Sequence, residues 1–370
     1  QTSILGGGVS AGSVDLFNSK PQFTILSGNT GGESYFGYIP EAVLTAAGGT
    51  QDNAVTFNSD GRGDEVNLFG GGLAAAAGYL ENAQVLGNSI TIDSGNTGSA
   101  EIVASGGGAA FTDEILASSY GSSARFARGV AADNKIIVTS GADVSAAGGG
   151  IFSASALSID QAEISGNKIE TVGSSARGGG LALMPRLEVA KYTISVENST
   201  IANNQLTAQS SSAVVAGAGI AVDAKFNYSE FVLDELTIVG NTGSRNGTPE
   251  GGQLSAVLAG NDIKFSLEKS LISGDTAQGA SDFIYDEGKN TVDVAYTAVF
   301  WGAAAPAIDG FLDPSVADPA FLGSLANNGG KYAESPFLGT EASISTRTNA
   351  LLDGSKAINA AGAPGCDPDT

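Results

Sequence analysis

The chain has 370 residues, of which 42% are hydrophobic, 15% are charged and 53 are glycine, and its formal net charge is −22. So many glycines disfavour long helices, and the excess of acidic groups argues against a nucleic-acid partner because it repels phosphate backbones. The sequence has no histidine and a single cysteine, Cys366, which excludes a Ser-His-Asp triad, an internal disulfide and the usual zinc sites.

The sequence begins with Gln1 rather than with methionine, which predicts an exported chain whose signal peptide has been removed. Ile4 and Leu5, the glycine triplet Gly6–Gly8 and Val9 follow at once, so a repeating pattern starts here without a preceding amphipathic helix. We therefore expect a first coil that has no cap. No apolar run reaches the roughly 18–20 residues of a membrane-spanning helix, so no transmembrane segment is expected.

Further glycine triplets punctuate the chain. They lie at Gly70–Gly72, Gly106–Gly108, Gly148–Gly150 and Gly178–Gly180. A short apolar segment usually follows, as in GGGIF and GGGLAL. Because glycine adopts backbone conformations that other residues avoid, each triplet predicts a tight corner that leads into a strand.

Four segments between and after these triplets align with one another. They are LSIDQAEISGN from Leu157, ISVENSTIANN from Ile194, FVLDELTIVGN from Phe231 and FSLEKSLISGD from Phe265, spaced 37, 37 and 34 residues apart. Alternating apolar residues predict strands with one face inward, and the Gly/Asn step after the second apolar pair predicts a turn. Together with the strand after the glycine triplet, each unit is predicted to hold three strands and to form one coil of a solenoid.

Two columns of the aligned segments are candidate structural sites. Ile164, Ile201, Ile238 and Ile272 form a core column, and Asn167, Asn204, Asn241 and Asp275 form a column at the turn. A partial earlier copy contains Val85, Gly87 and Asn88. We predict that the turn column is a hydrogen-bonding ladder between coils rather than a strip that binds a ligand.

These signals predict an all-β fold, a right-handed parallel β-helix of roughly nine coils that is about 40–45 Å long. The repeats are expected to occupy residues 1–302, and residues 303–370 are expected to pack on the helix as a C-terminal cap. A β-propeller would repeat every 40–45 residues or so with four strands in each blade, and a leucine-rich repeat would need a helical pattern that the sequence lacks.

The glycine runs followed by an apolar strand, together with I-x-x-N units such as ISVENSTIANN, resemble bacterial right-handed parallel β-helix repeat proteins. They are distantly similar to the chlamydial polymorphic outer-membrane proteins. The segments DPAFLGSLANNGGKY from Asp318 and ALLDGSKAINAAGAPGC from Ala350 resemble the tail of bacterial surface β-helix proteins of the choice-of-anchor type, with Asn359 where Asp is usual. The resemblance implies the fold and export, and it implies little about activity because this fold hosts many functions.

Carboxylates in adjacent repeats are the candidates for catalysis, because polysaccharide lyases and hydrolases on this scaffold use acid/base pairs or a calcium cradle. The candidate pairs are Asp160 with Glu163, Asp234 with Glu235, and Glu268 with Lys269. Solvated charges are expected at these outward strand positions in any case. We therefore predict no catalytic residues, no metal site and no cofactor, with calcium as the one ion kept open.

The chain is expected to be a secreted, non-enzymatic structural or adhesive protein of the cell surface or extracellular matrix. Its expected partners are further copies of itself, in a head-to-tail homo-oligomer or filament, or extracellular glycans. The alternative is a polysaccharide-acting enzyme, either a lyase or a hydrolase, or a glycan-binding module on the same scaffold.

Overall fold

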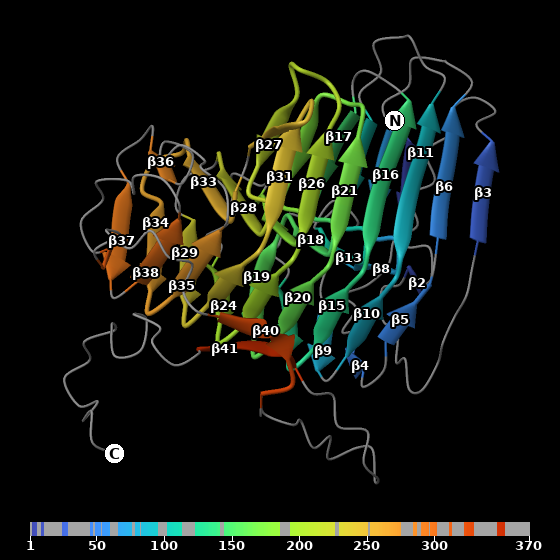
Figure 1. The fold of residues 1–370 in the computed structure, drawn as a ribbon. Helices are drawn as coiled ribbons and strands as arrows, with labels where there is room; N and C mark the ends of the chain where they lie inside the picture. The colour runs from blue at the N-terminus through green and yellow to red at the C-terminus, as the bar shows by residue number, and fades with distance from the viewer. Residues whose placement is uncertain are drawn as a thin grey trace, which may run out of the picture.

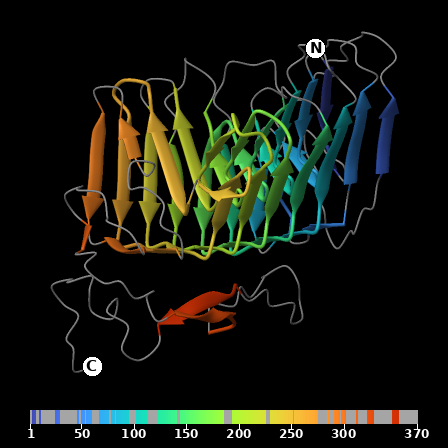
Figure 2. The same cartoon turned by 45° about the horizontal axis from the view of Figure 1, so that its top comes forward.

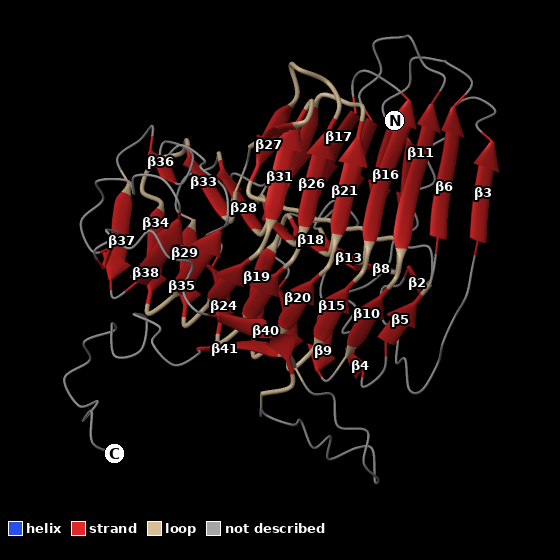
Figure 3. Cartoon of the chain, viewed as in Figure 1, coloured by secondary structure: helices blue, strands red, loops and turns tan. Residues whose placement is uncertain are grey.

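The computed structural model shows an all-β chain whose strands lie side by side in stacked parallel sheets, with no helix among the residues described (Figures 1 and 3). The described residues are 2–5, 9–10, 24–28, 45–46, 49–52, 54–59, 66–75, 78–81, 83–94, 102–112, 123–140, 144–185, 193–225, 229–250, 252–274, 284–286, 290–295, 297–301, 311–312, 322–328 and 346–351. This part of the chain accordingly contains no apolar helix that could cross a membrane.

Five sheets run along the molecule, each built from strands of successive repeats. In spatial order, sheet 1 contains β4 (Thr45–Ala46), β9 (Gly78–Glu81), β14 (Ser123–Ala127), β19 (Ala156–Asp160), β24 (Thr193–Glu197), β29 (Glu230–Asp234), β34 (Lys264–Glu268) and β37 (Thr291–Ala295). Sheet 2 contains β5 (Gly49–Gln51), β10 (Gln84–Leu86), β15 (Val130–Ala132), β20 (Glu163–Ser165), β25 (Thr200–Ala202), β30 (Thr237–Val239), β35 (Leu271–Gly274), β38 (Thr297–Trp301) and β39 (Phe311–Leu312).

The other three sheets complete each coil of the stack. Sheet 3 contains β3 (Thr24–Gly28), β6 (Ala54–Ser59), β11 (Ser89–Ser94), β16 (Lys135–Ser140), β21 (Lys168–Thr171), β26 (Gln205–Ala208), β31 (Thr242–Arg245) and the antiparallel β32 (Thr248–Pro249). Sheet 4 contains β1 (Thr2–Leu5), β7 (Val66–Phe69), β12 (Ile102–Ser105), β17 (Val144–Ala147), β22 (Ser175–Arg177) and β27 (Val214–Ala216). Sheet 5 contains β2 (Val9–Ser10), β8 (Leu73–Ala75), β13 (Ala109–Phe111), β18 (Ile151–Ser153), β23 (Leu181–Leu183), β28 (Ile220–Ala224), β33 (Leu254–Leu258) and β36 (Ile284–Asp286).

Consecutive strands of the chain visit these five sheets in turn. In the central repeats every fifth strand pairs in parallel with its counterpart in the neighbouring repeat, as β14, β19 and β24 do. The result is a solenoid-like stack, which Figure 2 shows from the side. The prediction of an all-β, parallel and repetitive fold is confirmed at this level.

Each central repeat holds five short strands instead of the three predicted from the sequence. The two additional strands belong to sheets 3 and 4, as β21 and β22 do in one repeat. Strands β22 and β27 lie in Ser/Ala/Gly-rich stretches whose composition is typical of loops. The expectation of three strands is wrong. Strands β22 and β27 are three residues long, too short to carry hydrophobic periodicity. Strand β21 does alternate, with Ile169 and Thr171 buried, and its signal directly after the turn was missed.

The main core fills the inside of the stack. The predicted core column of Ile164, Ile201, Ile238 and Ile272 stands in register on sheet 2, and all four side chains are fully buried. In sheet 1, Phe231 pairs with Phe265 and both rings join the same cluster. Inward-facing apolar side chains therefore stack coil upon coil, which is the main source of stability for a repeat protein.

A smaller apolar cluster lies on the outward side of sheets 4 and 5. On β18 the side chain of Ile151 belongs to the main core, so the neighbouring Phe152 faces outward. Phe152 is nevertheless fully buried, and its ring centroid lies 6.4 Å from that of Phe69. The cluster comprises Phe69, Ala74, Ala110, Ala147, Phe152, Ala154 and Ala182.

The turn that precedes sheet 3 has a left-handed backbone in successive repeats. Its residues are Asp52, Gly87, Asp133, Gly166, Asn203 and Gly240, with φ between 55° and 64°. Asp or Asn thus alternates with glycine from one repeat to the next. A Cβ at Gly166 would lie 2.6 Å from Oδ1 of Asp133, so the side chain of one repeat occupies the space that glycine leaves free in the next.

The described part of the C-terminal region forms a hairpin on the flank of the stack. Strands β40 (Leu322–Ala326) and β41 (Thr348–Leu351) pair antiparallel and lie beside the stack, away from the ends of sheet 2 (Figures 1 and 2). Strand β39, by contrast, adds to the end of sheet 2 by pairing with β38. The described strands of residues 303–370 therefore contact the stack both at an end and on a flank.

Candidate functional site

A row of six buried side-chain amides connects five consecutive repeats, and we call it the amide ladder. It consists of Asn88, Asn134, Asn167, Asn204, Asn241 and Gln253, all of which are buried. The ladder places three of the four predicted turn residues in one hydrogen-bonded line. Asp275, the fourth, lies outside the described residues.

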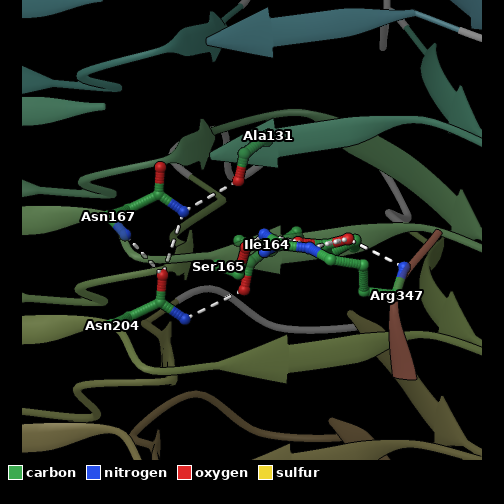
Figure 4. A network of polar contacts seen from close by, with 7 residues as sticks. Ala131, Ile164, Ser165, Asn167, Asn204 and Arg347 are labelled. Atoms are coloured by element: carbon green, nitrogen blue, oxygen red, sulfur yellow. Dashed lines mark hydrogen bonds and ion pairs between the residues drawn. The ribbon is translucent and has the colours of Figure 1, made fainter. Parts of the chain in front are cut away.

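Asn204 shows the geometry of the ladder (Figure 4). Its Oδ1 accepts hydrogen bonds from the backbone N–H of Asn167 at 3.0 Å and from Nδ2 of Asn167 at 2.9 Å. Its Nδ2 donates to Oδ1 of Asn241 at 2.8 Å and to the backbone carbonyl of Ile164 at 3.0 Å. All the hydrogen-bonding capacity of the amide is thus used to join neighbouring repeats.

The glycine triplets leave room for the ladder. A Cβ at Gly150, the third glycine of its triplet, would lie 2.7 Å from Nδ2 of Asn167. A Cβ at Gly180 would approach Nδ2 of Asn204 to the same 2.7 Å. The third glycine of one repeat is therefore required by the asparagine and by a backbone carbonyl of the next repeat.

The ladder ends on Gln253, which stands where the preceding repeat has the third glycine, Gly219. Its Oε1 accepts from the backbone N–H and Nδ2 of Asn241 at 3.2 and 2.7 Å, and its Nε2 donates to the Asn241 carbonyl at 2.8 Å. Gln253 thus supplies the acceptor that we expected from Asp275. Asn134 was missed from the sequence, although Asp133–Asn134 is the same Asx/Gly-Asn step as Gly166–Asn167.

A second polar cluster, which we call the clasp, joins the C-terminal hairpin to sheet 2. It consists of Glu163, Ser165 and Arg347. Because Ile164 between the first two belongs to the core, Glu163 and Ser165 face outward from β20. No sequence signal predicted the clasp, since 184 residues separate Glu163 from Arg347.

Arg347 and Ser165 bind the Glu163 carboxylate from several directions. Arg347 donates to it from its backbone N–H at 2.8 Å, from Nε at 3.0 Å and from Nη2 at 2.5 Å. Arg347 Nη2 also donates to Ser165 Oγ at 3.2 Å, and that hydroxyl donates to Glu163. The hydrogen bond to Glu163 raises the pKa of Arg347, and only 1% of the Glu163 side chain is exposed. Such charge-assisted bonds are stronger than those between neutral groups.

The structure divides the carboxylates that were considered for catalysis between two places. Glu163 belongs to the clasp, whereas Asp160 ends β19 in sheet 1. We call Asp160, Glu197, Asp234 and Glu268 the acidic row, because they stand in register on neighbouring strands of sheet 1. Within the described ranges, no group of three or more acidic or cysteine side chains is placed to hold a metal ion.

Two members of the acidic row are partnered by cations. Lys269 Nζ lies 3.3 Å from a carboxylate oxygen of Asp234 and 3.8 Å from one of Glu235, and the hydrogen bond to Asp234 raises the pKa of Lys269. Arg125 Nη2 lies 4.0 Å from Asp160. These pairs link adjacent repeats on an accessible face, where each contributes little to stability.

Asp223 is a further buried carboxylate that the sequence did not single out. It lies on β28 with 3% of its side chain exposed, and it forms an ion pair with Arg177 from sheet 4. Lys225 Nζ lies 3.4 Å from the same carboxylate. The Arg177–Asp223 pair joins sheet 4 of one repeat to sheet 5 of the next repeat.

The ladder, the clasp and the ion pairs described above all join neighbouring repeats or attach the hairpin to the stack. No protein-family model, no curated protein and no solved structure matches the chain.

Proposed function

We propose that the chain is a right-handed parallel β-helix of roughly nine coils that works as a non-enzymatic structural or adhesive protein of the cell surface or extracellular matrix. The amide ladder is the observation that carries this proposal. Fully satisfied buried polar networks stiffen a structure and fix one arrangement of its parts. A stack that is tied along its axis by such a ladder suits a rod that spans distance or presents a surface.

The ends of the sheets favour assembly of several copies. The first strand of each of the five sheets, β1 to β5, pairs with a single neighbour among the described strands. The last strands β37 and β39 also have one such neighbour each. Edge strands offer N–H and C=O groups that another strand can bind, so we propose that copies stack head to tail into filaments.

Repulsion between the acidic copies makes the salt concentration the condition to vary when this assembly is tested. The net charge of −22 opposes contact between copies at low ionic strength, because like charges repel over a longer Debye length. Filaments are expected to lengthen as NaCl or CaCl₂ is added. Electron microscopy and sedimentation velocity over a salt series measure this, and a strict monomer at every salt and protein concentration would refute filament formation.

The acidic row supports a second proposal, because four carboxylates on neighbouring strands form a straight track that a linear ligand can follow. In that alternative the chain is a glycan-binding module or a polysaccharide-acting lyase or hydrolase. Incubation with neutral, acidic and amino polysaccharides, read by released sugars and by binding to immobilised glycans, separates the two proposals. Loss of activity in Glu197→Gln but not in Glu170→Gln, a control on sheet 3, would favour the alternative.

The proposed location is tested separately from the assembly. An antibody against the purified chain should label intact producing cells or their surrounding matrix. Label that is confined to permeabilised cells would contradict export to the surface.

A further inference from the structure

We propose that the outward face of sheet 2 around β20 is a docking surface for a β-hairpin, and that it accepts the C-terminal hairpin of a second copy of this chain. This inference does not depend on head-to-tail stacking, because it concerns a flank of the stack rather than its ends. It starts from the clasp, which seats the chain's own hairpin on this face.

Glu163 marks one position in a column that is otherwise uncharged. The residues in register with it along β10, β15, β20, β25, β30 and β35 are Gln84, Val130, Glu163, Thr200, Thr237 and Leu271. Neighbouring strands are about 4.8 Å apart and have the same backbone geometry, so the sheet alone offers a hairpin several equivalent positions. Arg347 finds a carboxylate at one of these positions, and the ion pair therefore sets the register of the hairpin.

The surface around Glu163 is covered and made of small side chains. Ala132, Ser165, Thr200 and Ala202 flank Glu163 on the outward side of β15, β20 and β25, and all four are buried. Figure 1 shows β40 and β41 lying over this part of the sheet. Small uncharged side chains let a hairpin lie close to the sheet, and the buried carboxylate requires a cation from whatever covers it.

The chain's own hairpin follows β39 in the sequence but contacts sheet 2 at β20. Nine residues, 313–321, separate β39 from β40 in the sequence, while β39 and β20 are five strand positions apart in sheet 2, about 24 Å. The clasp contacts join the hairpin directly to β20. A hairpin from a second copy can make the same contacts, so the exchange is a domain swap.

Attachment within one chain favours the chain's own hairpin. A short tether gives it an effective concentration on the order of millimolar. The exchange between copies is therefore expected to become visible when the internal clasp is broken or when copies are concentrated on a surface.

Charge-reversal variants of the full chain test the inference. In E163R and in R347E, each studied alone, hydrogen exchange at the amides of β41 is expected to be faster by roughly tenfold or more, the effect of losing one charge-assisted hydrogen bond. The double variant E163R/R347E should restore slow exchange within one chain. Glu170→Arg, on sheet 3 of the same repeat, is the matched control and should leave β41 unchanged.

An equimolar mixture of the two single variants is the decisive sample. The hairpin of E163R carries Arg347, which fits the intact Glu163 of R347E, and the reversed charges complement each other at the second interface. With one partner labelled with ¹⁵N, native mass spectrometry should show heterodimers, and β41 should regain slow exchange in both partners. Heterodimers without this protection, or protection without heterodimers, would overturn the docking surface.

A mixture that stays monomeric with fast exchange at β41 would also overturn docking between copies. If exchange at β41 also stayed fast in the double variant, Glu163 would not set the register of the hairpin. Slow exchange at the Asn204 amide confirms that the stack is folded in each variant. If E163R does not fold, E163Q replaces it in the mixture with R347E. The hairpin of E163Q keeps Arg347, which fits the intact Glu163 of R347E, so native mass spectrometry should again show heterodimers, and their absence would overturn the inference.

Discussion

Replacing Asn204 with alanine removes one complete link of the amide ladder. The substitution deletes four hydrogen bonds, two accepted by Oδ1 and two donated by Nδ2. At about 1 kcal/mol for each buried hydrogen bond, the free energy of unfolding should fall by about 4 kcal/mol. The backbone N–H of Asn167 loses the acceptor that it has in the folded chain.

Two measurements read this change. Guanidinium unfolding gives the loss of stability, and hydrogen exchange at the Asn167 amide should become faster by roughly a thousandfold, the equivalent of about 4 kcal/mol. Gln205→Ala, at an exposed position on β26 in the same repeat, is the control and should stay within about 0.5 kcal/mol of the wild-type chain. A loss below about 1 kcal/mol with unchanged exchange at Asn167 would refute the role assigned to the ladder.

Three further substitutions test the packing around the ladder and on the flank, all measured by chemical unfolding. Gly150→Ala places a Cβ 2.7 Å from Nδ2 of Asn167 and 2.8 Å from the Gly180 carbonyl oxygen, and it should cost about 1–3 kcal/mol. Only the part due to Asn167 should be lost in the Asn167→Ala background, and a cost that stays the same would contradict the contact with Asn167. Gly166→Ala should cost a similar amount, because φ is +64° and the Cβ would lie 2.6 Å from Asp133 Oδ1. Asp133→Gly should relieve part of that cost, and strict additivity would show that the two residues do not share space. Phe152→Ala should cost about 3–5 kcal/mol as a buried aromatic residue, and a neutral effect would show that the outward cluster contributes nothing.

The repeating part of the fold could be read from the sequence because its determinants are local. Alternation around Ile164 indicates an inward-facing strand, and the Gly166–Asn167 step indicates the turn that follows it. Strands such as β22 and β27 gave no such signal, since they are only three residues long and pair with each other between neighbouring repeats. Their existence depends on tertiary pairing, which overrides weak local propensity.

The candidate sites also differ in whether local sequence patterns or tertiary contacts determine them. The amide ladder was predictable because asparagine recurs at one point of each repeat, yet its end at Gln253 was not, because that side chain comes from the glycine corner. The clasp depends on one glutamate on β20 and one arginine beside β41, far apart in the sequence. In the sequence, a charged residue at an outward strand position looks the same whether or not another segment covers it in the folded chain.

The alternating turn before sheet 3 limits how such a chain can change in length. The backbone repeats with every coil, but the chemistry of this turn repeats with every second coil, from Asp133 through Gly166 to Asn203. Deleting the repeat that contains Gly166 would set Asp133 directly against Asn203, and two side chains would claim one space. Deleting two successive repeats keeps the order intact. Duplications and deletions of repeats are therefore expected to involve an even number of coils, so that the stack grows or shrinks by pairs of coils.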